Sequence, residues 1–330
     1  MEMKRYEVIS IGNALLDITA NVDEGLLSEL GIRKGGMMLI SSEQQMKILS
    51  KIEKLNPFFS SGGSAANTAI GVSALGGKSA FIGRIGSDAY GKEYLEGLKK
   101  RGVDPYLTMD EDVPTGTAIT LITPDGERSF ATYLGAASRL RPEDIPLNAI
   151  AESRYVHVEG YLLDVPDIKR AIFSIVAGCK EKGVKLSIDL SDTGVVKRHR
   201  NDLKKALSGV ADVVFSNEDE SEEYTKACPE EAARTIGKGC SVAVVKIGEK
   251  GSIIFSEGAI YNIAAFKVKA VNSNGAGDAY AAGLLHSLAH GFPIEKAGKV
   301  AAYIAGQSVA SPEATVQRSL VDGIKKILED

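Results

Sequence analysis

Residues 274–283 read Asn-Gly-Ala-Gly-Asp-Ala-Tyr-Ala-Ala-Gly and begin a long helical pattern. Gly275, Ala276 and Gly277 are small enough for the unpaired amides of a first helical turn to approach a phosphate, and the helix dipole adds positive potential there. We therefore predict an anion hole with Asp278 on its rim, where a carboxylate can accept a proton from an attacking hydroxyl. An isolated Gly-x-Gly-Asp more often only turns the chain and offsets the helix dipole, so the surrounding sequence has to decide.

Around this turn, short apolar runs alternate with helical patterns along most of the chain. The first run, Tyr6–Ile11, is typical of a buried strand and stops at Gly12-Asn13. Such alternation predicts an α/β protein with a mainly parallel sheet. The other expected strands include 80–82, 155–158, 186–188, 213–215 and 242–247, and the expected helices include 64–75, 89–101, 168–182, 202–207 and 276–290.

Two regions break the alternation and require a second sheet. Strand patterns at 18–22, 37–40, 117–123 and 128–134 lack crossover helices between each neighbouring pair, and Pro124-Asp125-Gly126-Glu127 predicts a hairpin between the last two. We expect a small antiparallel sheet, built from discontinuous strands within about 14–40 and 114–136, that covers the active face as a lid. Since no linker separates this lid from the rest, residues 1–330 are expected to form one unit.

Composition excludes several classes of function. The 330 residues are 44% hydrophobic and carry a net charge of -4, so the chain has neither the bias of a disordered protein nor a basic field for nucleic acid or membrane surfaces. Three scattered cysteines suit a reducing compartment, and the N-terminus shows no signal or membrane-span pattern. We expect a cytoplasmic protein with a small-molecule partner, either monomeric or a homodimer formed through the exposed lid sheet.

Three better-known site patterns find little support. Val72 stands where a P-loop ending in Gly77-Lys78-Ser79 would need glycine, and the first strand lacks a Gly-x-Gly-x-x-Gly after it. His286 and His290 have the spacing of a helical metal pair, but we identify no acidic or thiolate group placed to complete that site.

Two regions of the chain resemble the signatures of the ribokinase family, also called the PfkB carbohydrate kinase family. One runs from Gly-Gly-Ser-Ala-Ala-Asn-Thr-Ala at 62–69 through Gly-Arg-Ile-Gly-Ser-Asp-Ala-Tyr-Gly at 83–91, and the other is the glycine turn at 274–283. The resemblance spans nearly the whole chain. It implies a three-layer α/β/α domain with a lid, and an ATP-dependent kinase in which Asp278 takes a proton from a hydroxyl of a small sugar-containing substrate.

The family pattern also implies which residues hold the substrate. Asp17 follows the first strand, and a carboxylate there accepts two hydroxyl hydrogen bonds. Asn67 both donates and accepts, although a satisfied amide inside a helix is an equal alternative. Backbone at Gly62 and Gly63 allows a sugar ring to approach closely. Asn13, beside Gly12, belongs to the same expected set.

For the nucleotide, Asn217-Glu-Asp-Glu220 resembles an Asn-x-x-Glu motif that arranges Mg²⁺ and the ATP phosphates, with Glu220 acting through water. A solvated acidic start of a helix is the preferred explanation for the neighbouring acids. Lys246, Gly248 and Gly251 resemble the strand-turn segment under the nucleotide, with Lys246 where many members have threonine. Asn272 replaces an aspartate near the family's monovalent-cation site, which leaves activation by K⁺ open.

Within the family, residues 12–18 and 128–137 most resemble adenosine kinases and related bacterial nucleoside kinases. Phe130 or Tyr133 could stack on a purine from the lid, and lid core is the equal alternative for each ring. Glu159, at the end of a strand, could hold a sugar hydroxyl. Adenosine is the expected substrate. A kinase of another nucleoside, of ribose or fructose, or of 2-keto-3-deoxygluconate is the alternative, and a non-catalytic regulator or a vitamin kinase ranks below these.

Overall fold

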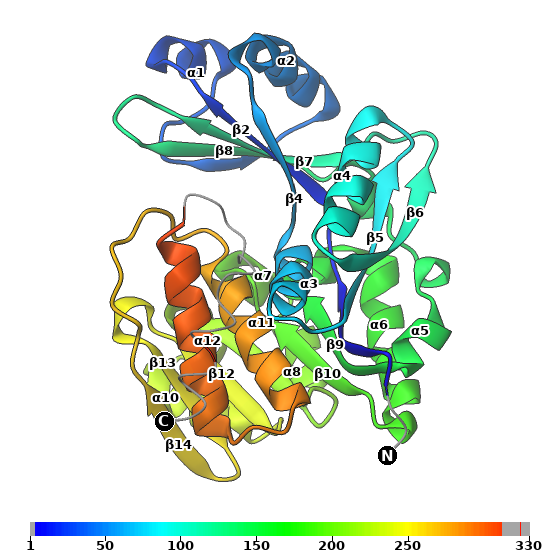
Figure 1. The fold of residues 1–330 in the computed structure, drawn as a ribbon, viewed down its shortest axis with the longest axis vertical. Coiled ribbons are helices and arrows are strands. Elements are labelled where there is room, and N and C mark those ends of the chain that lie inside the picture. Colours follow the sequence, from blue (N-terminus) through cyan, green and yellow to red (C-terminus); the bar gives the residue numbers. More distant parts are fainter. Residues whose placement is uncertain (1–3, 312–323, 325–330) are drawn as a thin grey trace.

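The computed structural model describes residues 4–311 and residue 324, and within them the larger sheet has nine strands. Their order is β14-β13-β12-β11-β10-β9-β1-β5-β6 (Figure 1). In this order, all neighbouring strands from β12 across to β6 pair in parallel. Strands β13 and β14, beyond β12, pair antiparallel. The strands are β1 (Tyr6–Ile11), β5 (Ser79–Gly86), β6 (Val103–Asp110), β9 (Ser153–Glu159), β10 (Lys185–Asp189), β11 (Val213–Asn217), β12 (Val242–Lys246), β13 (Ser252–Ser256) and β14 (Ala259–Ile263).

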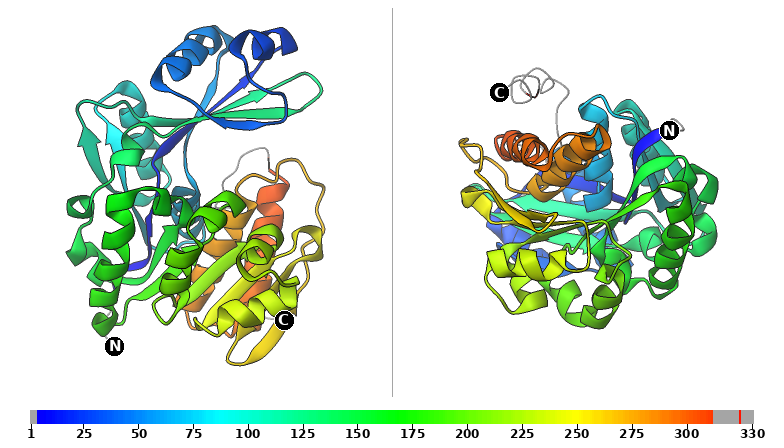
Figure 2. Two further views of the ribbon diagram at one scale, coloured as in Figure 1. Left: turned by 180° about the vertical axis from the view of Figure 1, so that it is seen from behind. Right: turned by 90° about the horizontal axis from the view of Figure 1, so that it is seen from below.

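Helices cover both faces of this sheet, as Figure 2 shows from below. Val8 of β1 packs with one helical layer, and Ile9 and Ile11 pack with the other, because successive side chains of a strand point to opposite faces. The first layer contains α3 (Ser64–Ala74), α11 (Ala276–Ala289) and α12 (Ile294–Val309); the second contains α5 (Leu147–Ala151), α6 (Pro166–Cys179), α7 (Thr193–Arg198), α8 (Arg200–Leu207), α9 (Glu218–Thr225) and α10 (Pro229–Gly237). The expected three-layer α/β/α fold is confirmed.

Five strands form the second sheet, in the order β3-β8-β7-β2-β4. Their bounds are β2 (Leu15–Asn21), β3 (Met37–Leu39), β4 (Phe58–Gly62), β7 (Gly116–Ile122) and β8 (Arg128–Tyr133). The expected hairpin is present: Gly126 has φ +85° and donates its amide hydrogen to Thr123 O. β4 was missed in the sequence and lies outside the two segments expected to form the lid.

The expectation of an antiparallel lid was wrong in detail, because the sheet is mixed. β2 pairs with β7 and β3 with β8 in parallel, whereas β2–β4 and β7–β8 are antiparallel. The parallel β2–β7 pair has a topological cause. β2 follows β1 and β7 follows β6, so both strands leave the same edge of the large sheet in the same direction.

One face of the lid is covered and the other faces the large domain. Helices α1 (Glu24–Leu30) and α2 (Ser42–Ile52) lie over the outer face, where Leu16 and Ile18 pack with Ile48 (Figure 1). The cross-strand register assigns two rows to the opposite face. The row beside the large domain is Ser60–Asp17–Ala118–Thr132–Leu39, and the next is Phe58–Thr19–Thr120–Phe130–Met37.

The part of the first signature at 83–91 builds structure at the base of the lid. Arg84 is almost fully buried and bonds to Asp110 at 3.0 Å and to Asp144 at 3.0 and 3.1 Å. A Cβ on Gly91 would lie 2.2 Å from Gly86 O, so the chain can pass there only with glycine.

Among the helices that the structure describes, α4 (Ala89–Lys100) included, none is long and apolar enough to cross a membrane.

Candidate active site

Asp278 lies in the first turn of α11, where two helix N-termini meet. Its Oδ1 accepts a hydrogen bond from Ser64 Oγ at 2.7 Å, and its Oδ2 accepts one from Asn67 Nδ2 at 3.1 Å. Both donors belong to the first turn of α3, which packs beside α11 (Figure 1). The structure therefore brings the two signature regions into direct contact through the predicted catalytic carboxylate.

The environment of Asp278 suits a general base. Burial raises the pKa of Asp278 to about 6; the hydrogen bonds from Ser64 and Asn67 and the charge of Lys246 oppose that rise, and the Asp189 carboxylate adds to it. A base with a pKa near the working pH combines a large ionised fraction with a useful affinity for the proton.

The glycine turn has the geometry that its sequence predicts. Gly275 caps α11 with φ 75°, a left-handed conformation that favours glycine, and Ala276 N bonds to Ser273 O at 3.3 Å. The next amides, at Gly277 and Asp278, belong to the first helical turn and have no intrahelical acceptor. They can receive an anion at the positive end of the helix dipole.

Lys246 brings a cation to the same turn. A Cβ on Gly277 would lie 2.9 Å from Lys246 Nζ, so the ammonium group is next to the anion hole. Nζ also donates to Asp189 Oδ2 at 3.0 Å. Burial lowers the pKa of Lys246, but the charges of Asp189, Glu220 and Asp278 outweigh burial and raise it overall. Lys246 is therefore an ammonium ion held by a carboxylate beside the predicted anion hole.

Asn217 and Glu220 form a reciprocal cap at the start of α9. Glu220 accepts from Asn217 N and Asn217 Nδ2, both at 2.8 Å, and donates its own amide hydrogen to Asn217 Oδ1. Burial, followed by the charge of Asp189, raises the pKa of Glu220 to about 7. Each Glu220 oxygen keeps a free lone pair, so the cap is compatible with a water-mediated contact to Mg²⁺. Glu218 and Asp219 are exposed, as the preferred sequence explanation expects.

Gly248 and Gly251, the two glycines expected near the nucleotide, differ in what requires them. Gly248 has φ +59°, and no heavy atom lies within 4 Å of the place where its Cβ would be. At Gly251, φ is +103° and a Cβ would lie 2.0 Å from Ile263 O. Glycine is thus required at 251 because the backbone of Ile263 lies too close for a side chain. At Gly248 the positive φ favours glycine, but the space beside its Cα is open.

Glu159 and Asn13 meet where β9 and β1 end, at the switch in strand order. Glu159 Oε1 accepts from Asn13 N and Asn13 Nδ2, both at 2.7 Å, and Oε2 accepts from Ala65 N at 2.9 Å. Burial raises the pKa of Glu159 to about 7 against these bonds. Glu159 therefore uses most of its hydrogen-bonding capacity to hold the loop after β1 and the start of α3 in place. Its predicted contact with a substrate hydroxyl stays a prediction.

Two buried amide oxygens have no partner. Asn13 Oδ1 and Asn67 Oδ1 belong to side chains whose nitrogens are bonded to Glu159 and Asp278, yet neither oxygen accepts a hydrogen bond from the residues that the structure describes. A buried polar atom without a partner is costly unless a ligand or water completes it. This supports the prediction that both asparagines contact substrate hydroxyls.

Asp17 stands on the inner face of the lid, and Gly62 makes room for it. A Cβ on Gly62 would lie 2.1 Å from Asp17 Oδ2, and one on Gly63, which has φ +93°, would lie 2.3 Å from Asn13 O. Both glycines thus leave space for neighbouring groups of the protein, and the predicted approach of a sugar ring to their backbone stays a prediction. Burial and then the charge of Asp278 raise the pKa of Asp17 to about 7.

The structure separates the two aromatic candidates. Phe130 shares the inner lid face with Thr120 and Thr19, whereas Tyr133 is one pleat out of phase and packs against the lid core. Phe130 is therefore the ring available for stacking. Tyr133 packs with the lid core, which was the alternative expected for either ring.

Sequence reasoning missed Asp189 and Ser64. Asp189 ends β10 next to Glu159, which ends the neighbouring β9, and their Cα atoms are register partners. A carboxylate at the carboxyl end of a parallel strand is the signal that pointed to Glu159, and it applies equally to Asp189. Ser64 lies inside the quoted signature, between the glycines and Asn67.

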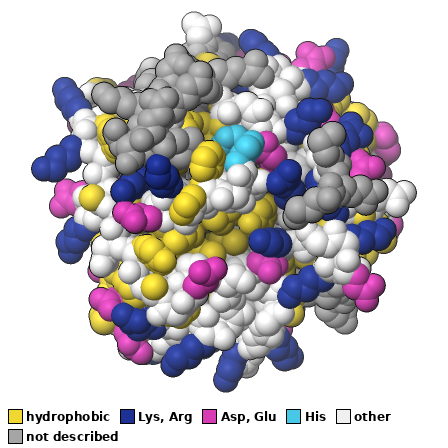
Figure 3. Space-filling model, turned by 60° about the horizontal axis from the view of Figure 1, so that its bottom comes forward, with side chains coloured by type: hydrophobic (Ala, Val, Ile, Leu, Met, Phe, Trp, Pro, Cys, Tyr) yellow, Lys and Arg dark blue, Asp and Glu magenta, His cyan; other side chains and the backbone are white. Residues whose placement is uncertain are grey.

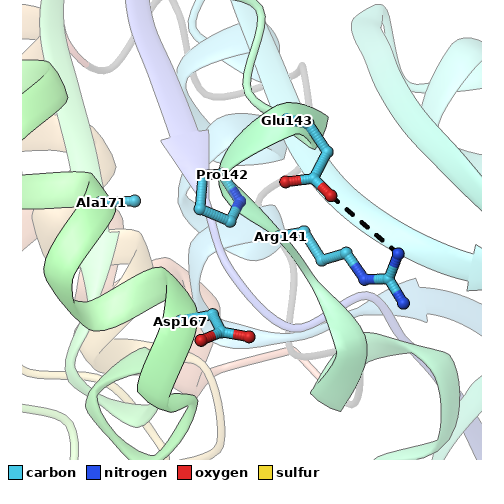
Figure 4. Close-up of a pocket in the computed structure, with 5 residues that line it drawn as sticks. All are labelled: Arg141, Pro142, Glu143, Asp167 and Ala171. Atoms are coloured by element: carbon cyan, nitrogen blue, oxygen red, sulfur yellow. Dashed lines mark ion pairs between the residues drawn. The ribbon is translucent and has the colours of Figure 1, made fainter.

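A hollow on the described part of the surface lies away from these residues. Figure 4 shows its lining of Arg141, Pro142, Glu143, Asp167 and Ala171, with an Arg141–Glu143 ion pair at 4.0 Å. Its volume is about 650 Å³, but it contains none of the predicted site residues. We therefore place the candidate site at Asp278.

Comparison with known proteins agrees with this geometry. Residues 47–319 match the model of the pfkB family carbohydrate kinases. A probable sugar kinase from Rhizobium etli CFN 42 has a TM-score of 0.89 at 32% identity, and the match covers 98% of this chain and 99% of that one. For an adenosine kinase from Sinorhizobium meliloti the TM-score is 0.88 at 32% identity with the same coverage. A fructokinase from Klebsiella pneumoniae is 31% identical over 245 residues, 70% of this chain and 78% of that protein.

Proposed function

The chain belongs to the pfkB family of carbohydrate kinases and is a phosphotransferase, and from that premise we propose that it phosphorylates the 5′-hydroxyl of adenosine with ATP. Asp278 takes the proton from the hydroxyl as the hydroxyl oxygen attacks the γ-phosphorus of ATP in line; the bond from this phosphorus to the β,γ-bridging oxygen breaks, and ADP leaves. The glycine turn at Gly275, Ala276 and Gly277 stabilises the charge on the transferred group through the amides left free in the first turn of α11, those of Gly277 and Asp278, since the Ala276 amide is bonded to Ser273 O. The observation that carries the proposal is the convergence of Ser64, Asn67 and Lys246 on this carboxylate and its glycine turn.

Mg²⁺ and the nucleotide fit the acidic and glycine-rich side of the site. Glu220 would hold Mg²⁺ through water, and Asn217 keeps that carboxylate oriented. Gly248 and Gly251 leave backbone exposed for ATP. The bound Mg²⁺ supplies charge neutralisation between the phosphates and the carboxylates. Asn272 Oδ1 accepts from Asn274 N at 3.0 Å, so a neutral amide braces the loop at the position expected for a K⁺-linked aspartate.

The inner lid face supports a nucleoside over a free sugar. Met37 and Leu39 are each 64% exposed, and Phe58 is 54% exposed. Leu39 belongs to the row that contains Asp17, and Met37, Phe58 and Phe130 belong to the row next to it. A free sugar offers hydroxyls in all directions and gains little from such apolar surface, whereas a purine presents a flat apolar face. The similarity to the adenosine kinase over nearly the whole chain points the same way.

The decisive test is a comparison of kcat/KM with MgATP for adenosine, other nucleosides, ribose, fructose and 2-keto-3-deoxygluconate. We expect adenosine to have the highest value, with the phosphate on its 5′ oxygen. Higher kcat/KM for fructose or another free sugar would refute the nucleoside assignment while leaving the kinase chemistry intact. That outcome would agree with the similarity to the fructokinase.

Replacing Phe130 by alanine should raise KM for adenosine about tenfold or more, with a smaller change in kcat. Stacking of a base on an aromatic ring contributes roughly 1–3 kcal/mol, and it acts on ground state and transition state alike. Steady-state kinetics check this, with Tyr133→Phe as the control because Tyr133 packs in the lid core. An unchanged KM in Phe130→Ala would remove this ring from the substrate site.

Activity should fall on acidification because Asp278 must be ionised to accept a proton. Burial raises its pKa to about 6, so kcat/KM for the acceptor at saturating MgATP should fall as the pH drops through about 6, and the fall should approach tenfold per pH unit well below that value. Above that range protonation of Asp278 is no longer limiting. A pH–rate profile that stays level down to pH 5 would contradict the assigned base.

A further inference from the structure

At the opposite end of α11 from Asp278, Glu7 of β1 lies against His286 and His290. Glu7 Oε2 is 2.8 Å from His286 Nδ1, and Glu7 Oε1 is 3.6 Å from His290 Nε2. Each of the three side chains offers one possible ligand atom, and these three atoms lie within 4.8 Å of one another. The sequence analysis found no acidic group to complete the histidine pair, and the fold supplies one from 279 positions away.

The ring of His290 is already in the tautomer that a metal needs. Its Nδ1 is 2.9 Å from the carbonyl oxygen of His286, and a carbonyl can only accept, so Nδ1 carries the hydrogen. In the neutral ring this leaves the Nε2 lone pair directed at Glu7 Oε1. Two lone pairs facing each other at 3.6 Å need a proton or a cation between them. Backbone carbonyls commonly orient metal-binding histidines in this way.

The spacing also suits a tetrahedral ion. Ligand atoms about 2 Å from a tetrahedral Zn²⁺ lie about 3.3 Å from each other, close to the 3.6 Å between Glu7 Oε1 and His290 Nε2. His286 would coordinate through Nδ1 after its ring takes the neutral tautomer with the hydrogen on Nε2. The Glu7 and His286 side chains are 18% and 14% exposed and His290 is 46% exposed, so a fourth position is open to solvent.

Two further features of the fold favour a cation here. A Cβ on Gly77 would lie 2.4 Å from Glu7 Oε2, so only glycine lets this carboxylate reach the histidines. His286 lies in the last turn of α11 and His290 caps it, where the negative end of the helix dipole stabilises positive charge. In Figure 3, where the bottom of the molecule comes forward, acidic and basic side chains surround a group of hydrophobic ones.

We propose that Glu7, His286 and His290 form a binding site for a divalent transition metal such as Zn²⁺ or Ni²⁺. Two imidazoles and one carboxylate select these ions over Mg²⁺, which prefers oxygen ligands. His286 and His290 follow Asp278 by 8 and 12 positions along α11, about 12 and 18 Å at the helical rise of about 1.5 Å per residue, so the metal takes no direct part in phosphoryl transfer. Its effect is on stability, since an ion that binds only the folded chain raises the unfolding temperature.

The test is calorimetric titration of ZnCl₂ and NiCl₂ into the full chain, prepared without a histidine tag. We expect one ion per chain, and an affinity at least about 100-fold lower in each of Glu7→Gln, His286→Gln and His290→Gln. A matched control is His199→Gln, which removes a histidine paired with Asp164 on another helix and should bind the metal as the unmodified chain does. Mg²⁺ should not compete.

A second measurement guards against loss of folding in the variants. Zn²⁺ should raise the unfolding temperature of the unmodified chain and of His199→Gln, and leave that of folded His290→Gln unchanged. All four variants should retain turnover with MgATP. The proposal fails if no ion binds, or if Zn²⁺ binds the three ligand variants as tightly as the unmodified chain, which would assign the metal to the carboxylates around Asp278 instead.

Discussion

Replacing Asp278 by asparagine should lower kcat by a factor of about 100 to 10,000, the usual contribution of a general base. Asparagine keeps the size of the side chain but cannot accept the proton from the substrate hydroxyl. It can still hydrogen-bond Ser64, so the junction of α3 and α11 should remain. Because the anion hole uses backbone amides, affinity for MgATP should change little. Single-turnover rates and nucleotide binding measured on the same preparation check both expectations.

The matched control for Asp278→Asn is Glu295→Gln, which removes an exposed carboxylate paired with Lys299 on the surface of α12. Exposed helix pairs contribute little to stability, so this variant should have normal turnover. If Asp278→Asn retained near-normal kcat while Glu295→Gln also did, the base would have to be sought among the other buried carboxylates. Asp189 would be the next candidate.

Replacing Lys246 by methionine should lower kcat about 100-fold, the loss seen when one preorganised electrostatic group is removed from a transition state. Methionine has a similar length and no charge. Lys246 Nζ lies beside Gly277, where negative charge accumulates during transfer. Stability should fall as well, by about 3 kcal/mol, because Asp189 would be left as a buried carboxylate without its partner. Saturating kinetics and urea unfolding measure the two effects.

A double variant separates the two roles of Lys246. Lys246→Met combined with Asp189→Asn removes both charges, so most of the stability should return while turnover stays low. This result would assign Lys246 to the reaction and not only to the fold. Turnover within about threefold of normal in the single variant would instead make Lys246 a structural partner of Asp189.

Much of the fold followed from local patterns. β1 has the predicted bounds, and the other predicted strands of the large sheet lie within or close to the observed ones. Strands β4, β6, β13 and β14 were missed, and two of them, β6 and β4, have weak patterns for physical reasons. β6 contains Pro105, which is tolerated because β6 is an edge strand, and β4 is a short edge strand of the lid that ends in glycine. The mixed pairing of the lid depends on where the chain enters it, and no local pattern records that.

For the site, local chemistry predicted Asp278 and the glycine turn, and the family resemblance predicted Asn67, but neither predicted their mutual contacts. Whether Phe130 or Tyr133 faces the substrate depends on pleat parity across the sheet, which only the register resolves. Glu159 looked like a sugar ligand, and the structure shows a carboxylate engaged by Asn13 and the start of α3.

The amino-acid sequence alone determined which chemical groups the protein has, and its local periodicity determined which helices and strands carry them. Only the tertiary structure decided which groups meet: Asp278 with Ser64, Lys246 with Asp189, and Glu7 with His286, pairs separated by 214, 57 and 279 positions. The reason is that secondary structure reflects interactions within a few residues, whereas burial, hydrogen bonding and charge act between any groups that packing brings within a few ångströms.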